Sequence, residues 1–197
     1  MNKLSNIPET MYRAFTEERY ARAFVERGKL RLRRLDLYRD IEDGCRRDAS
    51  EGMGSYVDNR GHQWDFEMGN SIYVLCCSDA QVDVRFLREK FGAYIVRIND
   101  SASLAHDMER FMNASGMRTF NGVHGRRVDY RKGAVTTQEF DSMQLAILSI
   151  TQKPARFAPE SEYRFFTILS NAIPSGTGKR FLDINIGHRL RYAELVE

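Results

Sequence analysis

Two glutamates, Glu160 and Glu162, have the clearest potential for chemistry, because they stand directly before an apolar strand pattern in residues 153–169. In this segment, KPARFAPESEYRFFTIL, the side chains from position 163 onward alternate between two faces, which is the period of a β-strand. Its two prolines remove backbone donors, so the residues before Glu160 are predicted to form a loop or a sheet edge. A carboxylate at a strand entrance is held by a rigid sheet beside a cleft, where catalytic groups commonly lie. The alternative is a surface ion pair between Glu162 and Arg164, which would contribute little.

Other polar side chains fall at the ends of other predicted strands, namely Arg13, Tyr38, Asp40, Asp43 and Ser78. Arg13 lies inside a short apolar run, MYRAF, so we expect its side chain to be partly enclosed. An enclosed arginine needs an acidic partner or a phosphate, because burial of an unpaired charge is very costly. Arg13 is therefore predicted to face either a carboxylate of the protein or a bound anion.

The periodicity of the chain predicts the elements that position these groups. We expect strands, either amphipathic or continuously apolar, over residues 11–15, 30–38 (with a break), 72–77, 93–98, 126–132, 163–169, 181–187 and 190–196. Helices are expected from an N-cap at Thr16 to a C-cap at Gly28, over residues 84–91, and over residues 104–112 with Asp100 or Ser101 as N-cap. Residues 138–148 fit a helix, although a strand near Leu148 is an alternative. Residues 44–70 lose apolar periodicity and are predicted to be a long loop or an insertion.

This order of elements predicts one α+β domain over residues 1–197, with a mixed or mostly antiparallel sheet. The composition, 42% hydrophobic and 29% charged residues, excludes a disordered or membrane-embedded chain. No apolar run approaches the roughly 20 residues of a membrane span, and the first residues lack the apolar core of a signal peptide. We therefore expect a cytoplasmic protein that does not contact a membrane.

Cysteines and histidines give no pattern of a metal site. Of three cysteines, two are adjacent, Cys76 and Cys77, which suits neither a disulfide framework nor metal ligation. The four histidines are scattered without ligand spacing. No phosphate-binding loop, dinucleotide glycine motif or zinc-protease motif is present. No metal cofactor is expected.

Positive charge is mild overall but clustered. The net charge is +3, which does not by itself indicate nucleic-acid binding. Arginine greatly outnumbers lysine in two clusters, and its planar guanidinium suits phosphate. A nucleotide or a nucleic acid is therefore a predicted partner, although solvated faces would explain the same residues. The arginines predicted to contact nucleic acid are Arg33, Arg34, Arg46, Arg47, Arg126 and Arg127.

The order of Arg13, Ser78 and the Glu160–Glu162 pair resembles the Arg–Ser–Glu arrangement of ADP-ribosyltransferases. The segments YRAF followed by LRLRRLDLYRDIED, then IYVLCCS, FGAYIVRIND and KPARFAPESEYRF, also resemble a poorly characterised bacterial family of uncharacterised function. The resemblance to the transferases implies a split sheet with flanking helices and a cleft that binds NAD as a substrate. It implies that Arg13, Tyr38 and Ser78 contact NAD, with Arg13 on a phosphate or ribose and Ser78 on the nicotinamide ribose.

The same resemblance implies catalytic roles for both glutamates. Glu162 would stabilise the oxocarbenium-like centre that forms as nicotinamide leaves, and Glu160 would orient or deprotonate a nucleic-acid or protein acceptor. Such a role is physically reasonable, because cleavage of an N-glycosidic bond builds positive charge at the anomeric carbon.

Two alternatives use the same residues differently. A DNA glycosylase would also break an N-glycosidic bond, with the clustered arginines as a groove and the 44–70 segment, including Trp64, as a wedge beside a flipped base. A non-catalytic nucleic-acid-binding module, for example in phage defence, would use the arginines alone. This last alternative predicts that the glutamates can be replaced without loss of activity.

Overall fold

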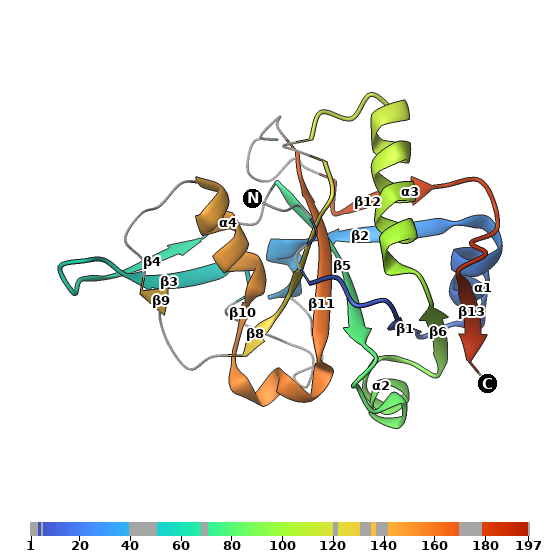
Figure 1. The fold of residues 1–197 in the computed structure, drawn as a ribbon, viewed down its shortest axis with the longest axis horizontal. Helices are drawn as coiled ribbons and strands as arrows, with labels where there is room; N and C mark the ends of the chain where they lie inside the picture. The colour runs from blue at the N-terminus through green and yellow to red at the C-terminus, as the bar shows by residue number, and fades with distance from the viewer. Residues whose placement is uncertain are drawn as a thin grey trace.

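The central strand of the main sheet is β5 (Ile72–Asp79), which is buried along nearly all its length (Figure 1). The computed structural model describes residues 4, 6–39, 51–67, 71–119, 122–130, 135–136, 142–169 and 179–196. Within these ranges the fold is α+β, with a mostly antiparallel open sheet and a few helices. None of the described helices is long and apolar enough to cross a membrane.

The main sheet has eight strands, in the order β12-β2-β5-β1-β6-β13, while β11 pairs with β5 and β7 pairs with β11. These strands are β1 (Met11–Phe15), β2 (Lys29–Arg34), β6 (Tyr94–Ile98), β7 (His124–Arg127), β11 (Glu162–Ile168), β12 (Phe181–Asn185) and β13 (Ala193–Val196), together with β5. All pairings in this sheet are antiparallel. Two small sheets stand beside it, formed by β3 (Met53–Val57), β4 (Gln63–Glu67) and β9 (Val135–Thr136), and by β8 (Asp129–Tyr130) and β10 (Gln152–Lys153).

The two edges of β5 are paired very differently. On one edge, β11 pairs with β5 from Ile168 opposite Ile72 to Glu162 opposite Ser78. On the other edge, β2 pairs with residues 73–74 and β1 pairs with residues 78–79. In the described part of the chain, no strand pairs with this second edge at residues 75–77. The sheet therefore has a gap between β1 and β2, beside the middle of β5.

Helices cover both faces of the sheet. The helices are α1 (Glu18–Arg27), α2 (Val84–Phe91), α3 (Ser101–Ala114) and α4 (Ser142–Thr151), with two 3₁₀ turns, η1 (Leu35–Tyr38) and η2 (Ala155–Glu160). The largest apolar cluster joins α1 and α3 to one face of β5 and β11, through residues such as Phe24, Met108 and Phe165. The opposite face carries a second cluster around Phe166 and α4. The alternation predicted for residues 163–169 is therefore confirmed.

Most predicted strands and helices are present, including β1, β5, α2, and α3 with Asp100 as its N-cap. The predicted C-cap Gly28 has the left-handed conformation, at φ 60°, that glycine adopts most readily. The predicted N-cap Thr16 is wrong, because the helix begins after Glu17, whose backbone is extended and whose side chain caps nothing.

Three further predictions need correction. The described part of the predicted 44–70 loop, residues 51–67, contains the β3–β4 hairpin, which projects from one end of the molecule (Figure 1). The residues before Glu160, predicted as loop or edge, form η2, which has Pro154 as its N-cap residue and contains Pro159. The helix predicted at 138–148 is α4, which runs to Thr151, and residues 138–141 lie outside the described residues.

Candidate active site in the gap of the sheet

A pocket of about 230 Å³ opens in the sheet gap beside β5. All five residues predicted to be catalytic or to bind NAD line it: Arg13, Tyr38, Ser78, Glu160 and Glu162. They come from β1, η1, β5, η2 and β11, so the fold gathers them from positions up to 149 residues apart, Arg13 to Glu162. Asp40 and Asp43 lie outside the described residues.

Strand register explains how the central residues meet. Ser78 on β5 lies opposite Tyr12 of β1 on one side and opposite Glu162 of β11 on the other. Residues opposite each other in a sheet have side chains on the same face, so Tyr12, Ser78 and Glu162 form a row across three strands. All three residues line the pocket.

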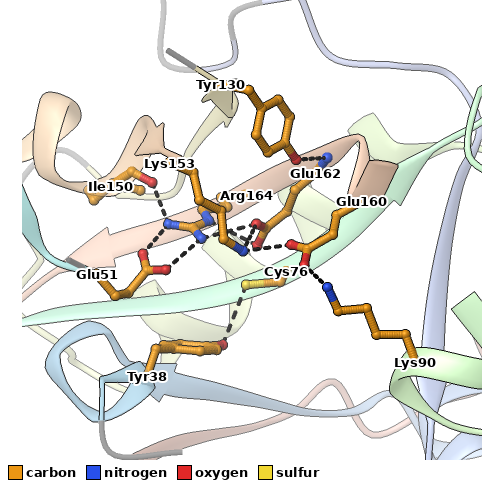
Figure 2. A network of polar contacts seen from close by, with 10 residues as sticks. All are labelled: Tyr38, Glu51, Cys76, Lys90, Tyr130, Ile150, Lys153, Glu160, Glu162 and Arg164. Carbon is orange, nitrogen blue, oxygen red and sulfur yellow. Dashed lines mark hydrogen bonds and ion pairs between the residues drawn. The ribbon is translucent and has the colours of Figure 1, made fainter. Parts of the chain in front are cut away.

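Arg164 is the most buried charged group of the site, with 1% of its surface exposed. Its guanidinium binds two carboxylates at once (Figure 2). Its Nε and Nη2 donate to Glu162 at 2.9 and 3.0 Å, and Nη2 also donates to Glu51 at 3.0 Å. Its Nη1 donates to Glu51 and to the Ile150 carbonyl. All five N–H donors of Arg164 are therefore used within the protein.

Lys153 links the two predicted glutamates. Its ammonium group donates to Glu160 at 2.6 Å and to Glu162 at 3.1 Å (Figure 2). Lys90 of α2 donates to the other oxygen of Glu160 at 2.7 Å. The ion pair expected between Glu162 and Arg164 therefore exists, but it is buried and belongs to a network of six charged side chains rather than to the surface.

The backbone between the glutamates turns both side chains toward Lys153. Ser161 has φ 43° and ψ 50°, a left-handed conformation that is uncommon for a residue other than glycine. Its hydroxyl donates to Asp79 at 2.8 Å, and its carbonyl accepts from the Asp79 backbone N–H at 2.9 Å. These bonds fix the junction of η2 and β11, which sets the relative positions of Glu160 and Glu162.

The carboxylates of the site have opposite pKa shifts. Burial alone would raise the pKa of Glu162, but Arg164 and Lys153 together lower it well below its usual range. Burial raises the pKa of Glu51, and the pull of Arg164 only partly opposes this effect. The pKa of Lys153 is raised despite its burial, because Glu162 and Glu160 favour the ammonium form. Glu162 and Lys153 are thus held in their charged forms, whereas burial favours the protonated form of Glu51.

Two neutral groups border the same network. The hydroxyl of Tyr38 lies 3.4 Å from the Cys76 sulfur, and burial raises the pKa of both groups. A thiol must ionise to act as a nucleophile, so Cys76 serves as an apolar neighbour of the carboxylates.

Arg13 differs from the other cations of the pocket. Its side chain donates to the Cys76 carbonyl at the unpaired edge of β5 and lies over the Phe15 ring at 5.3 Å. Its Nε is buried and has no hydrogen-bond partner among the described residues. No described carboxylate pairs with Arg13, and Glu162, which lines the same pocket, is bound by Arg164 and Lys153 instead.

The arginines predicted to bind nucleic acid are not gathered in the same way. Arg33 and Arg34 lie on β2 and Arg126 and Arg127 on β7, and these strands are separated by β5 and β11. Arg34 pairs with Asp36, Arg127 pairs with Asp79, and Arg126 is only 9% exposed. Arg33 donates to the Leu37 carbonyl beside the Tyr38 ring. Arg46 and Arg47 lie outside the described residues.

Sequence reasoning missed Glu51 and Lys153 as members of the site. Lys153 is the first residue of the 153–169 segment, but no periodicity in the sequence shows that its ammonium group is buried. Glu51 is 113 residues away from Arg164 in the chain, and it precedes β3 in a polar stretch. No local signal in the sequence marks that residue.

A comparison with family models, curated proteins and solved structures found no match for this chain. Within the described ranges, His, Cys, Asp and Glu side chains form no group of three or more that could hold a metal ion. The function is therefore argued from the geometry of the pocket.

Proposed function

We propose that this protein cleaves the N-glycosidic bond of NAD and transfers ADP-ribose to a nucleic-acid or protein acceptor. One observation carries the proposal. Arg13, Ser78, Glu160 and Glu162, separated in the chain, line one pocket in the gap of the sheet. Polar groups that converge in a pocket beside perturbed carboxylates are typical of a catalytic site.

The charges of the pocket favour an anionic ligand. Three carboxylates, Glu51, Glu160 and Glu162, pair with three cations, Lys90, Lys153 and Arg164. This network is neutral when all six groups are ionised. Arg13 adds one positive charge to the pocket and carries a buried donor without a partner in the described chain. A phosphate oxygen would satisfy both the charge and the donor.

The two glutamates differ in how many hydrogen bonds they can still accept. A carboxylate offers about four acceptor positions. Glu162 accepts two bonds from Arg164 and one from Lys153. Glu160 accepts one bond from Lys90 and one from Lys153. Glu160 therefore has room for a hydroxyl of the ribose or of the acceptor, while Glu162 supplies a fixed negative charge near the anomeric carbon.

The size and walls of the pocket suit one end of a dinucleotide. Its volume is below the roughly 300–1,000 Å³ of pockets that enclose a whole drug-sized ligand. Tyr12, Leu87 and Phe91 add apolar surface to the lining. The nicotinamide ring and its ribose would lie inside, with the phosphates toward Arg13 and the adenosine outside the pocket.

The experiment is a measurement of nicotinamide released from NAD, with Glu160→Gln, Glu162→Gln and Arg13→Met beside the wild type. Glu194→Gln is the matched control, because Glu194 is half exposed and pairs with Arg97 on the surface. We expect the glutamate variants to lose about 10²–10⁴-fold in rate, and the control to keep the wild-type rate. Absence of nicotinamide release by the wild type, or glutamate variants within threefold of it, contradicts the proposal.

The nucleic-acid alternatives are tested by adding DNA to the same assay. Trp64, 53% exposed on the projecting hairpin, is the observation that favours a base-flipping wedge. Release of a free base from DNA without nicotinamide release from NAD would replace the proposal with a glycosylase. DNA binding that persists in both glutamate variants, with neither product, would indicate a non-catalytic module.

A further inference from the structure

Glu51 reaches the pocket from outside the main sheet, because it precedes β3 of a small separate sheet. It lies just before the β3–β4 hairpin and is 2% exposed, yet it lines the pocket beside Glu162. Both of its oxygens accept hydrogen bonds from the outer nitrogens of Arg164 (Figure 2). Each oxygen keeps one further acceptor position, which leaves room for a proton.

The positive charge available to Glu51 is smaller than that available to the other carboxylates. Glu162 shares Arg164 and also has Lys153, and Glu160 has Lys153 and Lys90. Among the described residues, Glu51 forms an ion pair only with Arg164, which it shares with Glu162. A buried carboxylate with less than one compensating charge takes up a proton more readily than its neighbours.

The groups around Glu51 reinforce this difference. Arg164 and Lys153 are the cations that act on it, and the negative charge of Glu162 opposes its ionisation. Cys76 and Tyr38, which line the same pocket, stay neutral because burial raises the pKa of both. The two carboxyls that share the Arg164 guanidinium therefore have pKa values shifted in opposite directions. Glu162 is favoured in the charged form and Glu51 in the protonated form. Such a pair is the usual arrangement in sites that combine a fixed charge with proton transfer.

We propose that Glu51 is the carboxyl of the pocket that exchanges a proton, and that its ionised form accepts the proton of the nucleophile that attacks the anomeric carbon. The second part rests on the proposed function. In that step the O–H bond of the acceptor breaks, and its electron pair forms the new O–C bond. The C–N bond breaks with its pair going to the nicotinamide nitrogen, which becomes uncharged. The proton passes to an oxygen of Glu51, so the step needs no further reactant.

The proton on Glu51 can be measured without any turnover. Infrared difference spectra across a pH series show the carbonyl stretch of an un-ionised carboxylic acid. We expect wild type and the control Glu67→Gln, an exposed change on the same hairpin, to show such a band titrating above 4.5, the ordinary pKa of glutamate. The band should be missing in Glu51→Gln. A wild-type spectrum without it, or the same band in Glu51→Gln, overturns the proposal.

Glu51→Asp provides a second variant if Glu51→Gln does not fold. It keeps a carboxyl group but moves it, so the band should remain with a changed midpoint. An unchanged midpoint would assign the band to another residue and would overturn the proposal.

The pH profile of nicotinamide release then tests whether Glu51 accepts the proton of the nucleophile during the reaction. We expect the acidic limb of the wild-type profile to disappear in Glu51→Gln, with a rate about 10²–10⁴-fold lower, and to remain in Glu67→Gln. If Glu51→Gln keeps both the limb and the rate, Glu51 is not the base. If the wild type releases no nicotinamide, the proposed function fails and base catalysis fails with it, while the infrared titration still decides whether Glu51 carries the proton.

Discussion

Arg13 and Arg164 line the same pocket, but the structure predicts opposite consequences for their replacement by methionine. Arg164 holds Glu51 and Glu162, and its removal leaves Glu51 without an ion-pair partner among the described residues. Loss of one partner from a buried ion pair destabilises a protein by about 3–5 kcal/mol, because the other charge stays buried and uncompensated. We expect Arg164→Met to lower the free energy of unfolding by this amount. A second change, Glu51→Gln, should recover part of the loss.

Arg13→Met should change the same free energy by about 1 kcal/mol or less. The variant loses the hydrogen bond to the Cys76 carbonyl, worth about 1.5–3 kcal/mol for a charged donor. It also loses the contact with the Phe15 ring, worth about 0.5–1 kcal/mol. In return it removes a buried Nε without a partner, whose burial costs about 1–3 kcal/mol. These contributions have opposite signs and similar sizes, so they nearly cancel.

The assay is urea-induced unfolding of the wild type and both variants, with and without NAD. At a concentration of 100 times its dissociation constant, a ligand that binds only the folded state adds about 2.7 kcal/mol of stability. We expect this increase in the wild type and a much smaller one in Arg13→Met. If Arg13→Met is as destabilised as Arg164→Met, then Arg13 has a permanent acidic partner and is not available for a ligand. An equal response to NAD in Arg13→Met and wild type would also refute the reasoning.

Three further predictions follow from single side chains. The folded pKa of Glu162 lies below its ordinary value of 4.5, so its ionisation stabilises the fold above that pH; this stabilisation is lost as the pH falls toward the lowered pKa. Glu162→Gln should therefore flatten the acid decline of the urea midpoint, and an unchanged decline would contradict this. The Trp64 hydrogen bond lowers the pKa of Asp58 to about 2, so Asp58→Asn should alter the emission of Trp64, the only tryptophan, at neutral pH without moving the urea midpoint. Ser161→Val and Ser161→Gly both lose the hydroxyl bond to Asp79, but Ser161→Val should be less stable than Ser161→Gly by about 1–3 kcal/mol because of the positive φ; equal urea midpoints for the two would rule out backbone strain.

The strands of the core were predictable because their apolar patterns are local. β5 is a continuous apolar run and β11 alternates strictly, and both patterns survive in the packed sheet. The β3–β4 hairpin was missed although Gln63–Glu67 (QWDFE) alternates polar and aromatic residues, because this run is only five residues long. Tyr56, Trp64 and Phe66 lie on one face of the hairpin, but the segment around them is mostly polar.

The residues of the candidate site were predictable only in part. Strand ends marked Arg13, Ser78 and Glu162, and the pairing of β1 and β11 with β5 brings these strands together. The depth of Arg164 was not predictable from its spacing to Glu162, because packing of other segments on that face decides it. The clustered arginines were predicted to bind nucleic acid because they are close in sequence, but proximity in sequence does not determine whether a side chain is exposed. Arg34 and Arg126 are largely buried, while Arg19 and Arg22, whose side chains are more than half exposed, pair with the nearby acids Glu17 and Glu18.

The charged network in the gap is better explained by the pocket than by stability. A buried ion pair is often no more stable than well-packed apolar residues of similar volume, because removal of both charges from water is costly. Apolar side chains could therefore fill a gap in a sheet without such a network. Here the six charged side chains of the network pair with one another, so their charges sum to zero. Next to them, Arg13 donates to the Cys76 carbonyl at the unpaired edge of β5, and its buried Nε has no hydrogen-bond partner among the described residues. A fold that needed only stability would not benefit from that unpaired donor, whereas a ligand with an anionic group would satisfy it. Arg164 has five bonded donors and Arg13 has an unfilled one; under the proposed function, the anionic group of the ligand would therefore lie at the β1 side of the gap and proton transfer would take place at the Glu51 side.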